Sequence, residues 1–223
     1  MKFYILLLSN VQVHLEAEFR RTEFSFEVMI NEDVEEEVLA LYKNERWEDI
    51  VNLDCTLSEL DKNKLFWVLP TINDLQWMKD IIDKYNIVGL ASIGCGCGLF
   101  EWLFQKYSGL NVIGIELDHS WWRSKYSPPL FLENMIFVRG NSTKIYLPEN
   151  YALLFCYFNN GPAFCNYIEN YKGNLLFIVG PKDGQNRSTD PMPFDAKFNK
   201  YGWKLISYKN LERTNDCVAV YSK

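Results

Sequence analysis

Short apolar runs alternate with amphipathic segments along most of this chain, and the runs have the length of buried strands. One run leads into Gly94, and the later ones are Val112–Glu116, Met135–Val138, Ala152–Tyr157, Leu175–Val179, Trp203–Ser207 and Cys217–Tyr221. Several are apolar at consecutive positions, which is typical of strands covered on both faces of a sheet. Only residues 208–216 separate the last two runs, too few for a crossover helix. The pattern predicts an α/β fold with a mostly parallel sheet that ends in an antiparallel hairpin.

Helical spacing of apolar residues appears in three places before the first of these runs. Val34, Val38 and Leu41 mark one helix, and Trp47, Ile50 and Leu53 mark a second amphipathic stretch. A further helix is predicted from about residue 74 to 85, with Asn73 or Asp74 as its N-terminal cap. Residues 11–15 alternate as a half-buried strand would. We therefore expect residues 1–70 to form a small accessory or lid region and residues 71–223 to form the main domain.

Composition and charge narrow the class of protein. The chain has 223 residues, 48% of them hydrophobic, which is enough for one sizeable core but not for a second full domain. A formal net charge of −6 disfavours general nucleic-acid binding, because phosphate neutralisation needs clustered Lys and Arg. No segment approaches the roughly 20 apolar residues that span a bilayer, so no membrane partner is expected.

The six cysteines form no C-x-x-C pair and the chain has only two histidines, so we predict no metal site. Several of the cysteines fall in predicted strands, as small apolar residues do in a reducing compartment. The expected location is cytoplasmic, with the nucleus as an alternative.

A glycine-rich loop, Ile93-Gly94-Cys95-Gly96-Cys97-Gly98, follows the first predicted strand and precedes a helical run. Such a loop lets the backbone approach a ligand without Cβ clashes. Glu116 ends the next strand, at about the 20-residue spacing from the loop at which an acidic side chain binds ribose hydroxyls. The order predicts a nucleoside-cofactor site, and the alternative is a structural turn without a ligand. An NAD-dependent oxidoreductase is disfavoured because Leu99 stands where the dinucleotide fingerprint needs Gly or Ala.

The G-x-G-x-G spacing resembles the first motif of class I S-adenosylmethionine (SAM)-dependent methyltransferases, and the resemblance covers roughly residues 74–223. It implies a Rossmann-like, doubly wound, seven-stranded sheet of order 3-2-1-4-5-7-6 with strand 7 reversed, and SAM as the cofactor. The positions that it implies for cofactor binding are Ser92, Gly94, Cys95, Gly96, Gly98, Glu116, Leu117, Asn141 and Ser142.

Two positions depart from the family pattern. Ser92 stands where the family usually has an acidic residue that orients the methionine amino group, and Glu101 on the following helix is a conceivable substitute. After the fourth strand the chain reads Tyr157-Phe158-Asn159-Asn160-Gly161-Pro162, without the proline pair of nucleic-acid amino methyltransferases. The catalytic residues stay unknown, and Tyr157, Asn159 and Asn160 are the candidates.

The resemblance implies methyl transfer from SAM to an acceptor that the sequence does not identify. A protein or small-molecule acceptor is favoured over RNA because of the acidic balance. The alternative is a non-catalytic SAM-binding or protein-interaction module on the same fold. Residues 1–70 are the expected surface for a protein partner.

Overall fold

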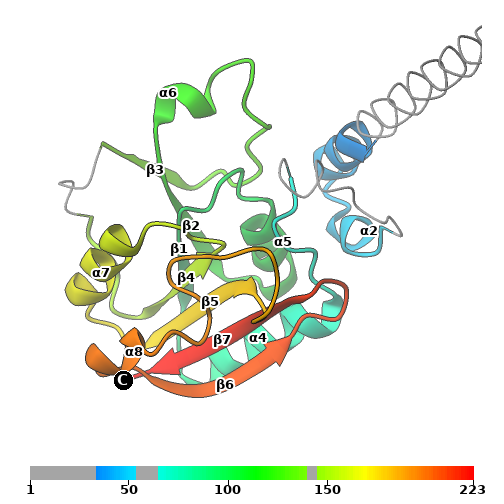
Figure 1. Cartoon of the computed structure of the whole chain (residues 1–223). Helices are drawn as coiled ribbons and strands as arrows, with labels where there is room; N and C mark the ends of the chain where they lie inside the picture. The colour runs from blue at the N-terminus through cyan, green and yellow to red at the C-terminus, as the bar shows by residue number, and fades with distance from the viewer. Residues whose placement is uncertain (1–33, 54–64, 140–144) are drawn as a thin grey trace, which may run out of the picture.

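The computed structural model describes residues 34–53, 65–139 and 145–223, which form a seven-stranded sheet with helices on both faces (Figure 1). The predicted strand at 11–15 lies outside these residues. The strands are β1 (Gly89–Ile93), β2 (Asn111–Leu117), β3 (Met135–Val138), β4 (Tyr151–Cys156), β5 (Leu175–Pro181), β6 (Lys204–Asn210) and β7 (Asp216–Ser222).

The strand order is β3-β2-β1-β4-β5-β7-β6, as the resemblance implied. The pairs from β3 to β5 are parallel, whereas β7 runs antiparallel to both β5 and β6. The predicted fold class and C-terminal hairpin are therefore confirmed. Two strand ends differ from the prediction: Trp203 precedes β6, and Tyr157 follows β4 with a left-handed backbone (φ 51°) that ends the strand.

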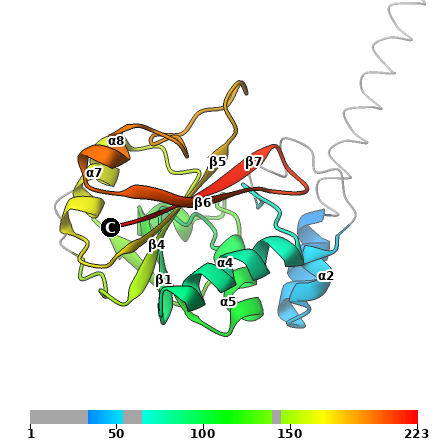
Figure 2. The same cartoon turned by 90° about the horizontal axis from the view of Figure 1, so that it is seen from below.

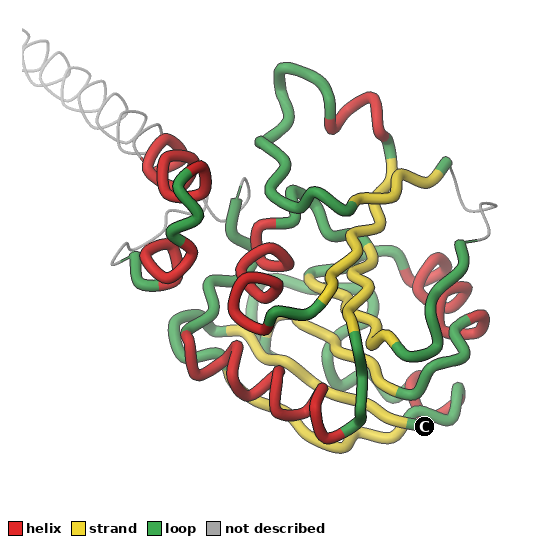
Figure 3. Tube along the Cα trace, turned by 180° about the vertical axis from the view of Figure 1, so that it is seen from behind, coloured by secondary structure: helices red, strands yellow, loops and turns green. Residues whose placement is uncertain are grey.

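Helices cover the sheet as two layers, seen from below in Figure 2 and as red segments on either side of the yellow strands in Figure 3. One layer holds α2 (Trp47–Val51), α4 (Ile72–Lys84) and α5 (Leu99–Ser108), and the other holds α7 (Gly161–Asn170) and α8 (Lys197–Lys200). The short α6 (His119–Trp122) projects beyond the carboxyl ends of the parallel strands (Figure 1).

The hydrophobic core is divided by the sheet because neighbouring strand residues point to opposite faces. Leu90 and Leu154 pack with Met78 of α4, whereas the next residues, Ala91 and Phe155, belong to the cluster around α7. Both faces of each central strand are thus buried, which explains why these runs are apolar at consecutive positions.

Helix α4 begins two residues earlier than the sequence suggested. Thr71 is its N-cap, and its Oγ1 accepts a hydrogen bond from the Asp74 backbone N–H at 3.2 Å. The Asp74 carboxylate in turn accepts from the Thr71 N–H at 2.9 Å. The predicted caps Asn73 and Asp74 were wrong because Asp74 is the third helical residue of this reciprocal capping box.

The described residues before residue 70 pack against the main sheet and share its core. Val38, Ile50 and Val51 are buried in the same cluster as α4 and α5. Tyr42 donates its hydroxyl to the Phe131 carbonyl at 3.0 Å, and Arg213 donates to the Val51 carbonyl at 2.6 Å. The division at residue 70 stays a prediction.

Candidate functional site

The glycine loop forms a tight turn from β1 into α5 at the carboxyl edge of the sheet. Gly94, Gly96 and Gly98 all have positive φ, between 60° and 76°. A Cβ on Gly94 would lie 2.7 Å from the Phe158 ring, so only glycine fits there. A Cβ on Gly96 would lie at least 3.8 Å from its neighbours, so there is space for a side chain. Only the backbone conformation, with its positive φ, disfavours one there.

Glu116 lies beside this loop because β2 pairs in parallel with β1, which places Ile115 next to Ile93. Its Oε2 accepts a hydrogen bond from the Gly96 N–H at 2.8 Å, and its Oε1 accepts from the Leu117 N–H at 2.7 Å. Burial raises the pKa of the carboxyl, and these hydrogen bonds oppose the rise. The Trp122 side chain also stabilises the carboxylate through a hydrogen bond, and a ribose hydroxyl can use the acceptor capacity that remains.

A cavity of about 260 Å³ opens next to Glu116. Its walls come from the ends of β1, β2 and β3 and from the start of α7, and include Gly94, Glu116, Leu117, Val138, Phe158 and Tyr167. It lies beside the point at which the strand order reverses, between β1 and β4, where open α/β sheets bind their ligands. The structure therefore brings Gly94, Glu116 and Leu117 together around one cavity. Asn141 and Ser142 lie outside the described residues, and their role stays a prediction.

On the opposite side of the loop, a serine and a glutamate form a buried pair. Ser92 Oγ donates to Glu101 Oε1 at 2.6 Å, and the two residues are 0% and 2% exposed. Burial raises the pKa of the Glu101 carboxyl from 4.5 to about 7. A buried carboxylate thus accepts from the hydroxyl of Ser92, the position at which the resemblance implied an acidic residue.

The loop cysteines face the protein interior. The Cys95 Sγ would lie 2.7 Å from a Cβ on Gly114, and Cys97 Sγ contacts the Leu65 carbonyl at 3.6 Å. Burial raises the pKa of both thiols, that of Cys97 to about 12, so they stay protonated. Cys95 therefore offers a ligand its backbone rather than its side chain. Among the described residues no cluster of His, Cys, Asp or Glu has the arrangement of a metal site.

Two tryptophans cover the glycine loop from outside the sheet. A Cβ on Gly96 would lie 3.8 Å from the Trp122 ring and 3.9 Å from Trp67 Nε1. Trp67 also stacks on Tyr157, with ring centroids 5.4 Å apart. The sequence did not predict Trp67 as a site residue. The one feature that could have indicated it is a polar N–H on an indole within an otherwise apolar run, between the buried Phe66 and Val68.

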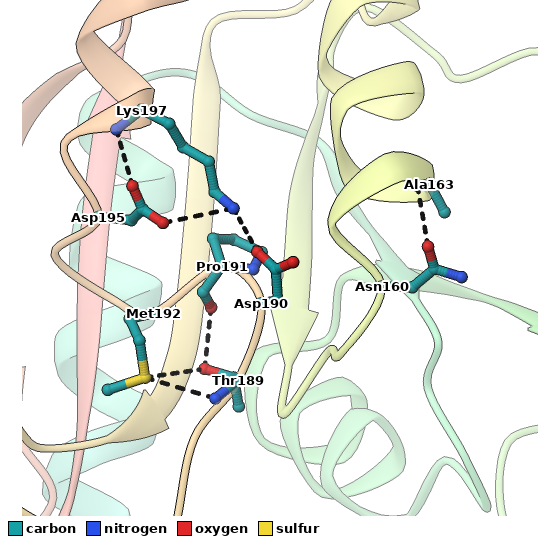
Figure 4. A network of polar contacts seen from close by, with 8 residues as sticks. All are labelled: Asn160, Ala163, Thr189, Asp190, Pro191, Met192, Asp195 and Lys197. Atoms are coloured by element: carbon teal, nitrogen blue, oxygen red, sulfur yellow. Dashed lines mark hydrogen bonds and ion pairs between the residues drawn. The ribbon is translucent and has the colours of Figure 1, made fainter.

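The three catalytic candidates have different surroundings. The Tyr157 hydroxyl donates to Asp216, and burial together with that carboxylate raises the pKa of the phenol. Asn160 Oδ1 accepts from the Ala163 N–H at 3.1 Å and so caps α7, as Figure 4 shows. Asn159 is exposed and forms a backbone bridge with Asp190.

A polar network holds the chain beyond β5 beside the start of α7 (Figure 4). The Asp190 N–H donates to the Phe158 carbonyl at 3.1 Å, while its carboxylate accepts from Lys197. Lys197 Nζ also lies 3.3 Å from an oxygen of Asp195. The loop after β5 is therefore tied to the end of β4, at the same edge of the sheet as the cavity.

The structure is similar to those of several methyltransferases. The methyltransferase domain of bacterial CtHen1-C is 13% identical over 68% of this chain and 98% of that domain, with a TM-score of 0.44. A SAM-dependent methyltransferase from Aquifex aeolicus is 14% identical over 68% of this chain and 97% of its own, with a TM-score of 0.42. Human N-acetylserotonin methyltransferase in complex with SAM is 13% identical over 68% of this chain and 55% of its own, with a TM-score of 0.43.

No protein-family model matches the sequence, and no curated protein matches it either. Among the described residues, no helix has the length and apolar character needed to cross a membrane.

Proposed function

We propose that this protein binds SAM and transfers its methyl group to an acceptor. The observation that carries the proposal is the position of Glu116. Its carboxylate accepts a hydrogen bond from the Gly96 N–H of the glycine loop and lines the cavity. An acidic group at the end of the second strand, within reach of a glycine turn, suits the two hydroxyls of a ribose.

The cavity also fits the rest of an adenosine. Leu117 and Val138 provide apolar walls for a ring, and Leu117 is 41% exposed, so its side chain is open to a ligand. For the methionine part of SAM, the chain supplies the Ser92 hydroxyl and the Glu101 carboxylate to which that hydroxyl donates. Above pH 7 Glu101 carries a negative charge that can balance an ammonium group.

When bound, SAM supplies a sulfonium methyl: the acceptor's lone pair forms the new bond to carbon, the S–C bond leaves its electron pair on sulfur, and the acceptor's proton passes to solvent. The chain's task is positioning, because holding the reactants in line supplies much of the rate. Glu116 and the glycine loop hold the nucleoside, while Trp67 and Trp122 exclude water above Gly96. The acceptor is a protein or small molecule rather than RNA, given the net charge of −6.

Calorimetric titration with SAM and with S-adenosylhomocysteine tests the proposal. The wild type is expected to bind both ligands saturably, and Glu116→Ala is expected to lose binding by about a hundredfold, because two charge-assisted hydrogen bonds disappear. Glu169→Ala, an exposed substitution on α7, serves as the control and should bind as the wild type does. A well-folded wild type that binds neither ligand would refute the proposal.

A second candidate function is SAM binding without methyl transfer. It is favoured because two candidate catalytic side chains already have structural hydrogen-bond partners. Tyr157 donates to Asp216, and Asn160 caps α7. Incubation with methyl-labelled SAM and cell extract separates the two functions. Label transferred by the wild type and not by Glu116→Ala supports the enzyme, whereas a wild type that binds SAM and transfers nothing supports the module.

A further inference from the structure

A second pocket, of about 490 Å³, lies at the same edge of the sheet as the cofactor cavity. Its walls come from three segments far apart in the sequence: the run before α4, the loop after β5 and the β6–β7 turn. Asp216 reaches this edge because the antiparallel pairing of β7 places it opposite Pro181, the last residue of β5. We call it the Asp216 pocket.

Two buried polar atoms in the Asp216 pocket have no hydrogen-bond partner within the described part of the chain. They are Oδ2 of Asp216, a residue that is 1% exposed, and Oγ1 of Thr214. Leaving a buried carboxylate oxygen without a partner is costly, so such an atom needs an explanation. A ligand that donates a hydrogen bond would supply one once a small rotation of the Asp216 side chain opens Oδ2, which has less than 1 Å² of accessible surface, to the pocket.

The charge of Asp216 is already balanced. Arg187 Nη2 lies 3.5 Å from Asp216 Oδ1, and the Arg187 guanidinium lies over the Tyr157 ring at 5.5 Å. Tyr157 donates its hydroxyl to the same carboxylate. The remaining oxygen therefore suits a neutral N–H donor as well as a cation, and a ligand need not bring a positive charge.

One wall of the Asp216 pocket is aromatic. Trp67 is 44% exposed and stacks on Tyr157 at an angle of 28° between the rings. A flat indole face favours a planar ring as its partner. The volume lies in the range of about 300–1,000 Å³ typical of small-molecule sites, which favours a small ligand over a polymer.

Two consecutive residues at the end of β4 lie between the two pockets and together contact both. Tyr157 and Phe158 are consecutive, yet Phe158 lines the cofactor cavity, whereas Tyr157 stacks under Trp67 of the Asp216 pocket. The left-handed backbone at Tyr157 is a conformation that nonglycine residues adopt at a cost, and such strain concentrates at functional sites. Trp67 Nε1 meanwhile lies near Gly96 of the loop.

We propose that the Asp216 pocket binds the methyl acceptor, and that this acceptor is a small planar molecule with an N–H group donated to Asp216. The inference rests on the proposed function, since it assigns the second substrate of that reaction. Trp67 provides the stacking surface, and the carboxylate sets the orientation of the ring.

Benzimidazole and 1-methylbenzimidazole are a matched pair of probes, because they share the ring and differ in the N–H. Saturation-transfer NMR titrations should show benzimidazole binding to the wild type about tenfold more tightly than the methylated ring. Asp216→Asn should remove that preference and leave the weaker probe unchanged. Trp67→Ala should weaken both probes by a similar factor, about fivefold, because it removes only the stacking.

SAM titrations of the same variants separate this inference from the proposed function. Asp216→Asn should retain SAM binding, which also shows that it is folded, and Glu116→Ala should lose SAM but keep benzimidazole. Trp67 also covers the glycine loop, so the folding of Trp67→Ala is checked by thermal unfolding instead. A wild type that binds SAM without preferring the N–H probe overturns the inference alone, as does displacement of benzimidazole by S-adenosylhomocysteine. A wild type that binds benzimidazole but not SAM refutes the proposed function, and the acceptor assignment with it.

Discussion

Two carboxylates flank the glycine loop, and their surroundings differ. Glu116 ends a strand at the cavity wall and accepts hydrogen bonds from two backbone N–H groups. Glu101 lies inside α5, is 2% exposed and accepts its side-chain hydrogen bond from the Ser92 hydroxyl. Burial raises the pKa of both; at Glu116 the N–H groups of Leu117 and Gly96 are the main opposing contacts, whereas at Glu101 the Ser92 hydroxyl is.

Under the proposed function, the two carboxylates would serve different ends of SAM. A carboxylate held by backbone N–H groups has a fixed position and a charge that is stabilised locally, which suits ribose hydroxyls. A carboxylate in an apolar surrounding is poised to change protonation near neutral pH. The four experiments below test this contrast, from the largest expected effect to the smallest.

Glu101→Gln should stabilise the protein at high pH. The folded state holds the Glu101 proton more tightly than the unfolded state, so the wild type loses stability as pH rises from about 4.5 through 7. Glutamine is always neutral and avoids this loss. Urea unfolding should give the variant a free energy of unfolding on the order of 3 kcal/mol higher than the wild type at pH 8, and similar at pH 5. An equal difference at both values of pH would show that Glu101 does not titrate in this range, and Glu169→Gln is the surface control.

Glu116→Gln should weaken the binding of S-adenosylhomocysteine by about thirtyfold, because the charge is lost and the single amide oxygen can accept from only one of the two backbone N–H groups, of Gly96 and Leu117. The side chain keeps its size, and thermal unfolding checks that the variant is folded. Calorimetry of the variant beside Glu169→Gln measures the loss. Wild-type affinity in Glu116→Gln would mean that the ribose binds elsewhere.

The affinity for SAM should rise by about tenfold between pH 6 and pH 8, because Glu101 gains the charge that balances the ligand's ammonium group. Calorimetric titrations at several values of pH check this. The curve for Glu101→Gln should be flat over the same range. If both proteins show the same slope, another group is responsible and Glu101 does not replace the acid missing at Ser92.

Gly96→Ala should lower the free energy of unfolding by about 1 kcal/mol, because an alanine at φ 60° is strained. Gly109→Ala is a matched control, since that glycine has φ 69° and no atom within 4 Å of its Cβ position. Thermal unfolding should show similar losses in both. Only Gly96→Ala should also weaken S-adenosylhomocysteine binding, because the strained alanine shifts the backbone N–H from which Glu116 accepts; equal binding by the two variants would contradict this role.

Local patterns predicted the parts of the site that lie close to strand ends. The loop and Glu116 were predictable because a parallel strand order places the carboxyl ends of neighbouring strands together. The cap of α4 was misplaced because Thr71 and Asp74 compete as caps until the reciprocal bonds are seen. Trp67 and Asp216 were not predicted as site residues, because no local pattern links a run before α4 to the first residue of β7.

The sequence by itself determined the α/β class, the hairpin and the glycine loop with its acidic partner, since each depends on apolar periodicity or short spacings along the chain. Only the tertiary structure decided what surrounds those groups. The Ser92–Glu101 pair becomes a buried, pH-sensitive contact through the packing of α5 on β1, and the Asp216 pocket exists through the reversal of β7 beside β5. Desolvation and long-range pairing are properties of the assembled core, and no single segment encodes them.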